Sequence, residues 1–135
     1  MNRRLWTATV PALLLLALSL TACASRAPAR ISVEVYKWRY EPTSWTVSAG
    51  REVEITLINH CTFEHSWVLL DKGYTFTPPF DEDDQAHVLW QGSVRNTGVA
   101  HTYTFTAPSE PGEYPVLCGI SSHLEESEVG TLIVK

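Results

Sequence analysis

After residue 30, apolar and polar residues alternate through several short runs, with the two-residue period of strands that bury one face. The period predicts strands at 31–40, 44–47, 52–59, 65–70, 101–107, 113–117 and from Gly130 onward. Turn-forming residues such as Pro42, Gly50 and Pro108 separate the runs, and no internal repeat or persuasive helical period accompanies them. The pattern predicts an all-β fold, a Greek-key β-sandwich of about seven to eight strands.

The stretch from residue 71 to residue 100 is the least regular part of the chain. It contains Pro78-Pro79, four consecutive acidic residues at 81–84 and an apolar triplet at 88–90. We interpret it as a long connection with one or two short strands. The acidic run can bind a hard cation such as calcium, but a solvated loop is the favoured interpretation.

The first residues have the layout of a secretory signal, because Arg3 and Arg4 precede a short apolar run that ends in small residues. The run is too short for a comfortable membrane span. Residues 20–23, Leu-Thr-Ala-Cys, resemble the bacterial lipoprotein box, which implies cleavage before Cys23 and a lipid on that cysteine. An ordinary signal peptide with a cysteine nearby is the alternative.

This resemblance divides the 135 residues into a signal peptide at 1–22, lipidated Cys23 with a small polar tether to residue 30, and one domain at 31–135. A hydrophobic content of 44% is enough for one core. The lipid would hold the domain at the cell membrane, on its extracytoplasmic or periplasmic face. The formal charge of −5 argues against a nucleic-acid partner and suits a basic redox partner, although acidic domains without such a partner are common.

The strongest candidate chemistry lies between the last two apolar runs. Cys118 closes one run, and His123 follows in a short polar loop rich in carboxylates. Thiolate and imidazole together suit copper or zinc, but one loop supplies only part of a coordination shell. His65, at the start of another run, is the best further ligand, because two His, one Cys and a weak axial group form the electron-transfer copper set. Asn59 or Ser66, and amides aimed at the sulfur, would support these ligands.

Other interpretations of the same residues stay open. An oxidising compartment permits a disulfide between Cys61 and Cys118, which would remove the thiolate. We prefer the metal site, with Cys61 as a buried or half-buried free thiol near the His65 strand. His65 and His123 can also be hydrogen-bonded residues at the rim of the core. The other three histidines are interpreted as surface or hydrogen-bonding residues: His60, His87 and His101.

Several motifs occur in the order in which the cupredoxins, the small blue-copper proteins, carry them. Ala49-Gly50 precedes V-x-I-x-L-x-N at 53–59, then come His65, E-P-G-E-Y at 110–114, Cys118, His123 and a V-G-T-L-x-V run. The chain thus resembles the plastocyanin-like and azurin-like cupredoxins over roughly residues 31–135. The resemblance implies an electron carrier rather than an enzyme, with one mononuclear copper bound by His65, Cys118 and His123.

Two positions depart from the family pattern: Ser121-Ser122 replace a frequent Pro-Gly, and Glu128 occupies the position of the axial Met. If Glu128 binds the metal, an oxygen anion replaces the thioether, and the ligand set resembles that of nitrosocyanin, a red-copper cupredoxin. If Glu128 points to solvent, a three-ligand electron carrier is implied. A copper- or zinc-handling protein and a metal-free binding module of the same fold are further alternatives.

Two other functions are excluded by the sequence. The related subunit II of the haem-copper oxidases needs two cysteines in this loop for its binuclear copper centre, and the loop here has only Cys118. No pairing of nucleophile and base, no paired catalytic carboxylates and no phosphate loop is recognisable, so we do not expect a hydrolase.

Overall fold

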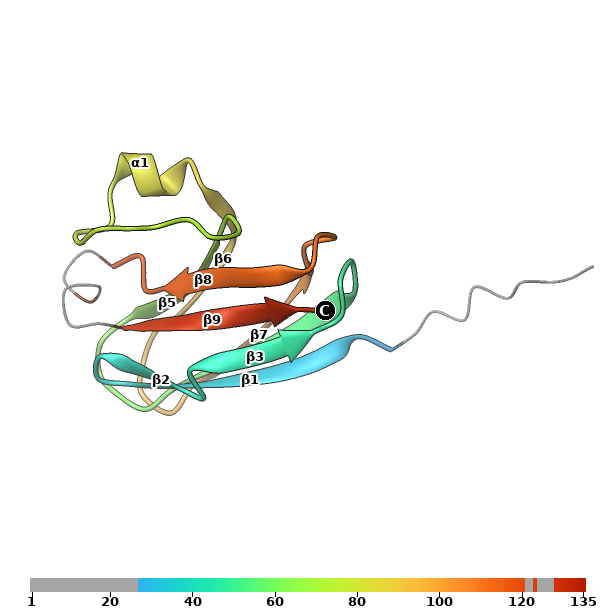
Figure 1. Cartoon of the computed structure of the whole chain (residues 1–135). Helices are drawn as coiled ribbons and strands as arrows, with labels where there is room; N and C mark the ends of the chain where they lie inside the picture. The colour runs from blue at the N-terminus through green and yellow to red at the C-terminus, as the bar shows by residue number, and fades with distance from the viewer. Residues whose placement is uncertain (1–26, 121–122, 124–127) are drawn as a thin grey trace, which may run out of the picture.

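Two sheets of mixed strand direction pack face to face in the computed structural model of the protein (Figure 1). The structure describes residues 27–120, 123 and 128–135. The four-stranded sheet has the order β2 (Arg39–Glu41), β1 (Ala29–Tyr36), β4 (Glu52–Asn59) and β7 (Ala100–Thr106). The five-stranded sheet has the order β3 (Ser44–Val47), β9 (Val129–Val134), β8 (Gly112–Leu117), β5 (His65–Leu70) and β6 (Val88–Val94). The β1–β4 and β3–β9 pairs are parallel, and the other pairs are antiparallel.

The core lies between the sheets and consists of the apolar residues of the alternating runs. In β4, Val53, Ile55 and Leu57 are fully buried, while the residues between them are half-buried. Trp67 of β5 packs edge-on against Trp45 of β3, with ring centroids 5.5 Å apart. Each fully buried Val, Leu or Ile contributes about 1.5–3 kcal/mol to stability. This burial pattern confirms the predicted all-β sandwich.

The described residues form nine strands, rather than the expected seven to eight, because residues 31–40 fold as a hairpin. β1 and β2 are joined by a tight turn in which Trp38 has a φ of 64°. Val33 and Val35 are buried before the turn and Tyr40 after it. A single strand with a two-residue period could not bury all three on one face, so the prediction of one continuous strand was wrong.

The acidic run in the 71–100 connection forms a one-turn helix, α1 (Glu82–Gln85). Asp81 caps the helix, because its side chain accepts hydrogen bonds from the N–H groups of Asp83 and Asp84. Asp84 is only 4% exposed and accepts a hydrogen bond from the Tyr74 hydroxyl. The run is therefore a short helix rather than a loop, while Asp81, Glu82 and Asp83 are exposed, as the favoured interpretation of a solvated segment expected.

The predicted signal and Cys23 lie outside the described residues. β1 starts at Ala29, so the last two residues of the predicted tether at 23–30 belong to a sheet, and Arg30 pairs with Glu54 at 2.9 Å. Among the residues that the structure describes, no helix is long and apolar enough to cross a membrane.

The strand register brings three segments together at one end of the five-stranded sheet. Leu117, the last residue of β8, pairs with Val129, the first residue of β9, and also with Val68 of β5. Cys118 and Glu128 therefore face each other where the chain leaves the sheet. Figure 1 shows the end of β8 and the start of β9 side by side there. The predicted metal ligands all come from this end.

Candidate metal centre

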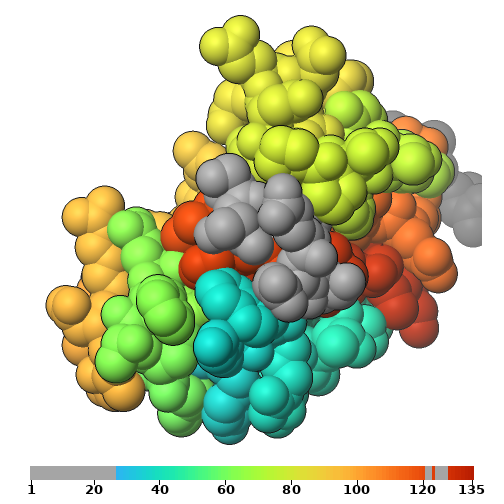
Figure 2. Space-filling model, turned by 90° about the vertical axis from the view of Figure 1, so that its left-hand side faces the viewer, coloured from blue at the N-terminus to red at the C-terminus, as the bar shows by residue number. Residues whose placement is uncertain are grey.

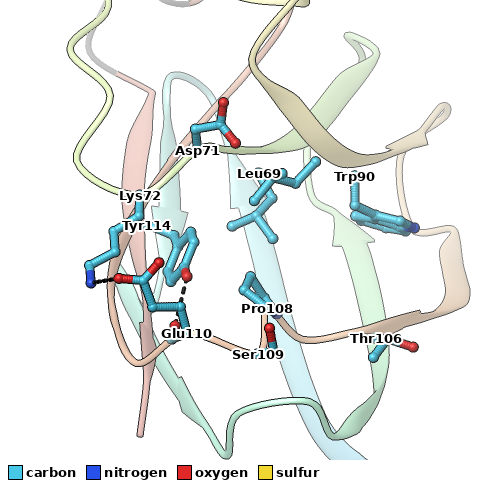
Figure 3. Close-up of a pocket in the computed structure, with 10 residues that line it drawn as sticks. Leu69, Asp71, Lys72, Trp90, Thr106, Pro108, Ser109, Glu110 and Tyr114 are labelled. Atoms are coloured by element: carbon cyan, nitrogen blue, oxygen red, sulfur yellow. Dashed lines mark hydrogen bonds and ion pairs between the residues drawn. The ribbon is translucent and has the colours of Figure 1, made fainter.

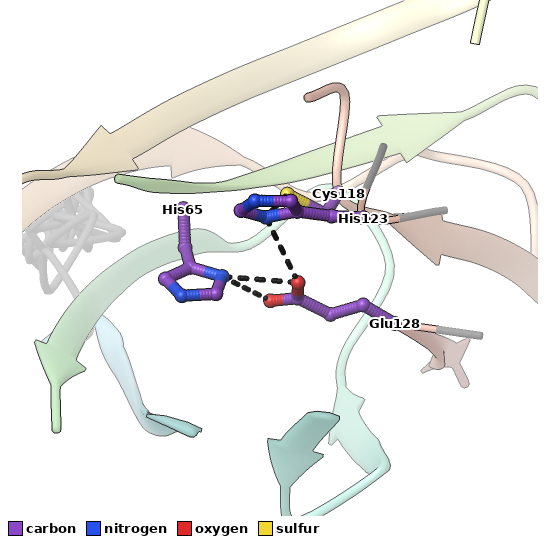
Figure 4. Close-up of side chains that lie close together, drawn as sticks. All are labelled: His65, Cys118, His123 and Glu128. Carbon is purple, nitrogen blue, oxygen red and sulfur yellow. Dashed lines mark hydrogen bonds and ion pairs between the residues drawn. The ribbon is translucent and has the colours of Figure 1, made fainter. Parts of the chain in front are cut away.

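The four side chains that the sequence suggested as ligands lie together in the structure (Figure 4). The ligand atoms of His65, Cys118, His123 and Glu128 are all within 4.8 Å of one another. The Glu128 carboxylate lies 2.8 Å from His65 Nδ1 and 3.4 Å from His123 Nδ1. His123 Nδ1 lies 3.5 Å from Cys118 Sγ. Donor atoms on one metal ion are separated by roughly 3–4 Å, given bonds of about 2.0–2.3 Å, so the cluster has the size of one mononuclear site.

Main-chain hydrogen bonds close the loop that carries three of these residues. The Cys118 N–H donates to the Glu128 carbonyl at 3.1 Å, and the Glu128 N–H donates to the His123 carbonyl at 3.4 Å. The His123 N–H donates to the Ile120 carbonyl at 2.8 Å. The β8–β9 pairing thus continues into the loop and fixes the backbone on both sides of the cluster, while His65 is added from β5.

Ser66 supports the Cys118 sulfur, as the sequence suggested. Its N–H lies 3.4 Å from Cys118 Sγ and its hydroxyl oxygen lies 3.6 Å from the same atom. The hydroxyl also accepts a hydrogen bond from the Gly119 N–H at 2.8 Å. The fully buried Tyr40 donates its O–H to the Ser66 carbonyl. Tyr40 was missed as a supporting residue because the sequence placed it on a continuous strand.

All four clustered side chains are withdrawn from water, with exposures of 0% for His65, Cys118 and Glu128 and 4% for His123. Burial raises the pKa of the Cys118 thiol to about 11, and the charge of Glu128 acts in the same direction, whereas hydrogen bonds from Ser66 and the Ile120 N–H oppose the rise. Burial lowers the pKa of His123 against the attraction of Glu128. Without metal, Cys118 is therefore a neutral thiol and His123 a neutral imidazole at neutral pH.

Two aromatic side chains, which we call the aromatic cap, cover His123. The Trp38 ring meets the His123 ring edge-on with centroids 4.4 Å apart, and the Phe63 ring lies 6.3 Å from it. Trp38 and Phe63 stack on each other at 5.6 Å. They come from the β1–β2 turn and the 60–64 segment, which adjoin on the face shown in cyan and green in Figure 2. A bulky residue at positive φ costs about 1–3 kcal/mol, so these contacts hold Trp38 in place.

Cys61 touches the site, although the sequence assigned it no role there. Cys61 and Cys118 are both free thiols, so the disulfide considered from the sequence is not formed. Cys61 Sγ lies 2.7 Å from His65 Nε2, the ring nitrogen that faces away from Glu128. The only signal in the sequence was the separation of four residues, and spacing alone does not show that the intervening turn brings the side chains together.

Three histidines lie outside the cluster and have partners of their own. These pairs are His60 with Glu34, His87 with Asp71, and His101 with the Ser93 carbonyl. They agree with the interpretation of these histidines as surface or hydrogen-bonding residues. Within the described part of the chain, the cluster at His65 is the only group of three or more His, Cys, Asp or Glu side chains close enough to share a metal ion.

A surface hollow of about 410 Å³ lies elsewhere on the molecule (Figure 3). Leu69, Trp90 and Tyr114 line its apolar part, and Lys72 and Glu110 form an ion pair of 2.6 Å at its edge. None of the four clustered residues lines it. The hollow therefore adds nothing to the chemistry of the metal centre.

Comparison with known proteins places this geometry in context. Neither a scan against protein-family models nor a search of curated proteins finds a match. Among solved structures, the reduced auracyanin of Roseiflexus castenholzii is similar with a TM-score of 0.66 and 23% identity, over 82% of this chain and 99% of its own. Auracyanin A, a "blue" copper protein of Chloroflexus aurantiacus, gives 0.65 and 25%, over 80% and 99%. Auracyanin B gives 0.64 and 22%, over 82% and 91%.

The chain has the cupredoxin fold. This fold explains why the motifs stand far apart in the sequence, since His65 on β5 and the loop between β8 and β9 meet only after the sheet has formed. Of the two departures noted in the sequence, Ser121 and Ser122 lie outside the described residues, whereas Glu128, aligned with the axial Met of the cupredoxin pattern, is described. The structure turns this side chain into the cluster, so the solvent-facing alternative considered from the sequence is wrong.

The raised pKa of Cys118 predicts how metal affinity depends on pH. Binding replaces the S–H proton, so the logarithm of the affinity should rise by about one for each pH unit below the thiol pKa. With that pKa at about 11, the rise should continue from pH 7 to beyond pH 9, where a thiol at the ordinary value of 9.0 would level off. His123, with its lowered pKa, stays neutral in this window and adds no slope. Anaerobic competition titration with a Cu(I) chelator measures the slope, Cys118→Ser should reduce it, and a plateau above pH 9 would contradict the raised pKa.

Proposed function

We propose that this protein is an electron carrier that binds one copper ion through His65, Cys118 and His123, with Glu128 as the fourth ligand. The observation that carries the proposal is the meeting of one thiol, two imidazoles and one carboxylate within 4.8 Å inside a cupredoxin fold. The similarity to auracyanin A, described as a "blue" copper protein, supports the choice of copper. We propose an electron carrier rather than an enzyme, because one thiol, two imidazoles and an axial group form the ligand set of electron-transfer copper sites.

The donor set fits copper by its chemistry. A thiolate and two imidazoles are soft and borderline ligands that accept Cu(I) and Cu(II) alike, and copper bound there supplies a one-electron couple. The protein provides a fixed frame for them, since main-chain hydrogen bonds hold the loop and Ser66 holds the sulfur. A fixed frame resists movement of the ligands when the charge on the site changes. Zinc suits the same ligand types, so metal handling is the alternative that metal analysis of the purified protein distinguishes.

Glu128 separates this site from a three-ligand blue site. Its carboxylate is fully buried and faces both histidines, with 2.8 Å to His65 Nδ1 and 3.4 Å to His123 Nδ1. An anionic oxygen favours Cu(II) over Cu(I), and the axial ligand is a recognised determinant of the potential. We infer a low-potential centre whose colour lies toward green or red. This buried carboxylate is the observation that favours the red-copper alternative, in which the ligand set resembles that of nitrosocyanin.

Electron exchange requires a partner that approaches the site. The aromatic cap packs against His123, and Phe63 of the cap is 45% exposed. An apolar, partly exposed cap permits close approach of another protein without a large cost of desolvating charge. The acidic character of the chain suits a redox partner protein with a basic surface, because complementary charge speeds encounter.

The localisation that we propose is the extracytoplasmic or periplasmic face of the cell membrane. The support is the sequence alone, in which Leu-Thr-Ala-Cys at 20–23 follows a signal-like apolar run and precedes a short tether. Several acyl chains on Cys23 would anchor the protein stably.

A metal-free binding module of the same fold is the competing hypothesis of another class. It does not require copper for function.

Replacing Cys118 tests the copper proposal directly. The Cu(II)-loaded wild-type protein should show a strong thiolate-to-copper charge-transfer band, and Cys118→Ser should abolish it, because the band requires sulfur bound to Cu(II). Cys61→Ser is the matched control, since it removes a thiol that lies outside the four-residue cluster, and it should keep the band. Visible absorption together with metal analysis provides the readout. Wild-type protein that takes up no copper, or shows no such band, would rule the proposal out.

Changing the charge of Glu128 tests its role as a ligand. Glu128→Met should raise the reduction potential by at least about 60 mV, equivalent to a tenfold loss of preference for Cu(II), and shift the colour toward blue. Glu128→Gln is the matched control, because it keeps the size of the side chain and removes only the anion, and it should give a smaller rise. Potential and absorption spectra are compared at one pH. If neither variant changes them, copper is held by His65, Cys118 and His123 alone.

Replacing Cys23 tests the proposed anchor. The wild-type protein should fractionate with membranes and carry a lipid on Cys23 in mass spectrometry, whereas Cys23→Ala should prevent lipid attachment. The absorption spectrum of the copper-loaded variant should match that of the wild type, because Cys23 precedes the described fold. An unmodified Cys23 in mature wild-type protein would contradict the lipoprotein assignment.

A further inference from the structure

We propose that Cys61 is a positioning residue of the metal centre: when His65 Nδ1 binds the metal, the Cys61 sulfur accepts a hydrogen bond from His65 Nε2–H and fixes the ring in that orientation. This inference rests on the proposed function, because it concerns how His65 presents itself to a metal ion. The observation behind it is the approach of Cys61 Sγ to His65 Nε2 at 2.7 Å.

The two nitrogens of His65 face different neighbours. Nδ1 lies 2.8 Å and 3.0 Å from the two carboxylate oxygens of Glu128, on the side of the four-residue cluster. Nε2 faces Cys61. When Nδ1 of a neutral imidazole binds a metal, the proton must sit on Nε2, which then becomes a hydrogen-bond donor. His65 is fully buried, so an unpartnered Nε2–H there would cost about 1–3 kcal/mol.

Cys61 is held in place by contacts that do not involve its sulfur. Its N–H donates to the Asn59 side-chain oxygen at 2.9 Å, and its carbonyl accepts a hydrogen bond from the Thr97 hydroxyl at 2.7 Å. The Asn59 amide also donates to the Phe63 carbonyl at 2.7 Å, which closes the turn between β4 and β5. The turn therefore keeps its shape when only the side chain of Cys61 is changed.

A metal-bound imidazole commonly donates its second N–H to an acceptor, which orients the ring and makes it a stronger ligand. Carboxylates, carbonyls and waters usually act as that acceptor, and here a half-buried thiol occupies the position. Loss of such an acceptor typically weakens metal affinity by about 10–100-fold. Positioning His65 in this way requires a hydrogen-bond acceptor at position 61. It does not require that the Cys61 sulfur bind the metal.

Two substitutions separate these possibilities. Cys61→Ala removes the acceptor, while Cys61→Ser keeps an acceptor and offers a poor ligand for Cu(I). Thr62→Ala, at the next and exposed position of the same turn, is the matched control. Anaerobic competition with a Cu(I) chelator gives the affinity, and proton–nitrogen NMR of the diamagnetic Cu(I) protein observes His65 Nε2–H. We expect Cys61→Ala to lose about 10–100-fold in affinity and the protected Nε2–H signal, and Cys61→Ser and Thr62→Ala to stay within about threefold of the wild type with that signal kept.

Each other outcome overturns the inference in a distinguishable way. Equal affinity and an unchanged Nε2–H signal in Cys61→Ala would show that His65 is oriented without the thiol, while leaving the copper proposal intact. A loss in Cys61→Ser as large as in Cys61→Ala would identify Cys61 as a metal ligand instead. Wild-type protein that does not bind Cu(I) would overturn both this inference and the proposed function.

Discussion

Glu128 carries a carboxylate that is completely withdrawn from water, and such a group is stable inside a protein only where positive charge or hydrogen-bond donors face it. His65 from β5 and His123 from the loop are those neighbours. The carboxylate therefore connects β5 to the loop between β8 and β9. The β8–β9 register places Glu128 opposite Cys118, and the aromatic cap limits access of water to His123. An imidazole that stays neutral, as His123 does, offers a hydrogen bond but no charge. A bound cation would supply the charge that the carboxylate otherwise lacks.

The strands that were predicted well are those in which the apolar residues occupy the same alternate positions from end to end, with turn-forming residues at both ends. The expected runs at 44–47, 52–59 and 65–70 have the same bounds as β3, β4 and β5. The run at 31–40 failed because its apolar phase shifts after Val35, so that Tyr40 rather than an odd-numbered residue returns to the core. That shift is visible in the sequence and marks a turn, yet the turn has no Gly, Pro, Asn or Asp to announce it.

The four clustered residues could be found from the sequence because three of them stand in one loop whose ends are fixed by neighbouring strands. Their surroundings could not be found in the same way. The contact of Cys61 with His65 depends on the conformation of the turn between β4 and β5, which a hydrogen bond to Asn59 stabilises. The stacking of Trp38 on Phe63 brings that turn into contact with the β1–β2 turn. Residue type and spacing predict which atoms are available to a metal. Which side chains orient those atoms depends on tertiary packing. Here they are Cys61 beside His65, Ser66 beside Cys118, and Tyr40 behind Ser66.

Trp38 has a φ of 64°, in the left-handed region that a bulky residue rarely occupies unless packing stabilises it there. The retaining contacts come from His123 and Phe63, and His123 is in position only when the ligand loop is closed. Turn and loop therefore stabilise each other, and opening one releases the other. The consequence is kinetic: the loop at His123 can move only if the packing of the hairpin against it loosens as well, so these contacts would slow the release of an ion bound on their side of the cluster.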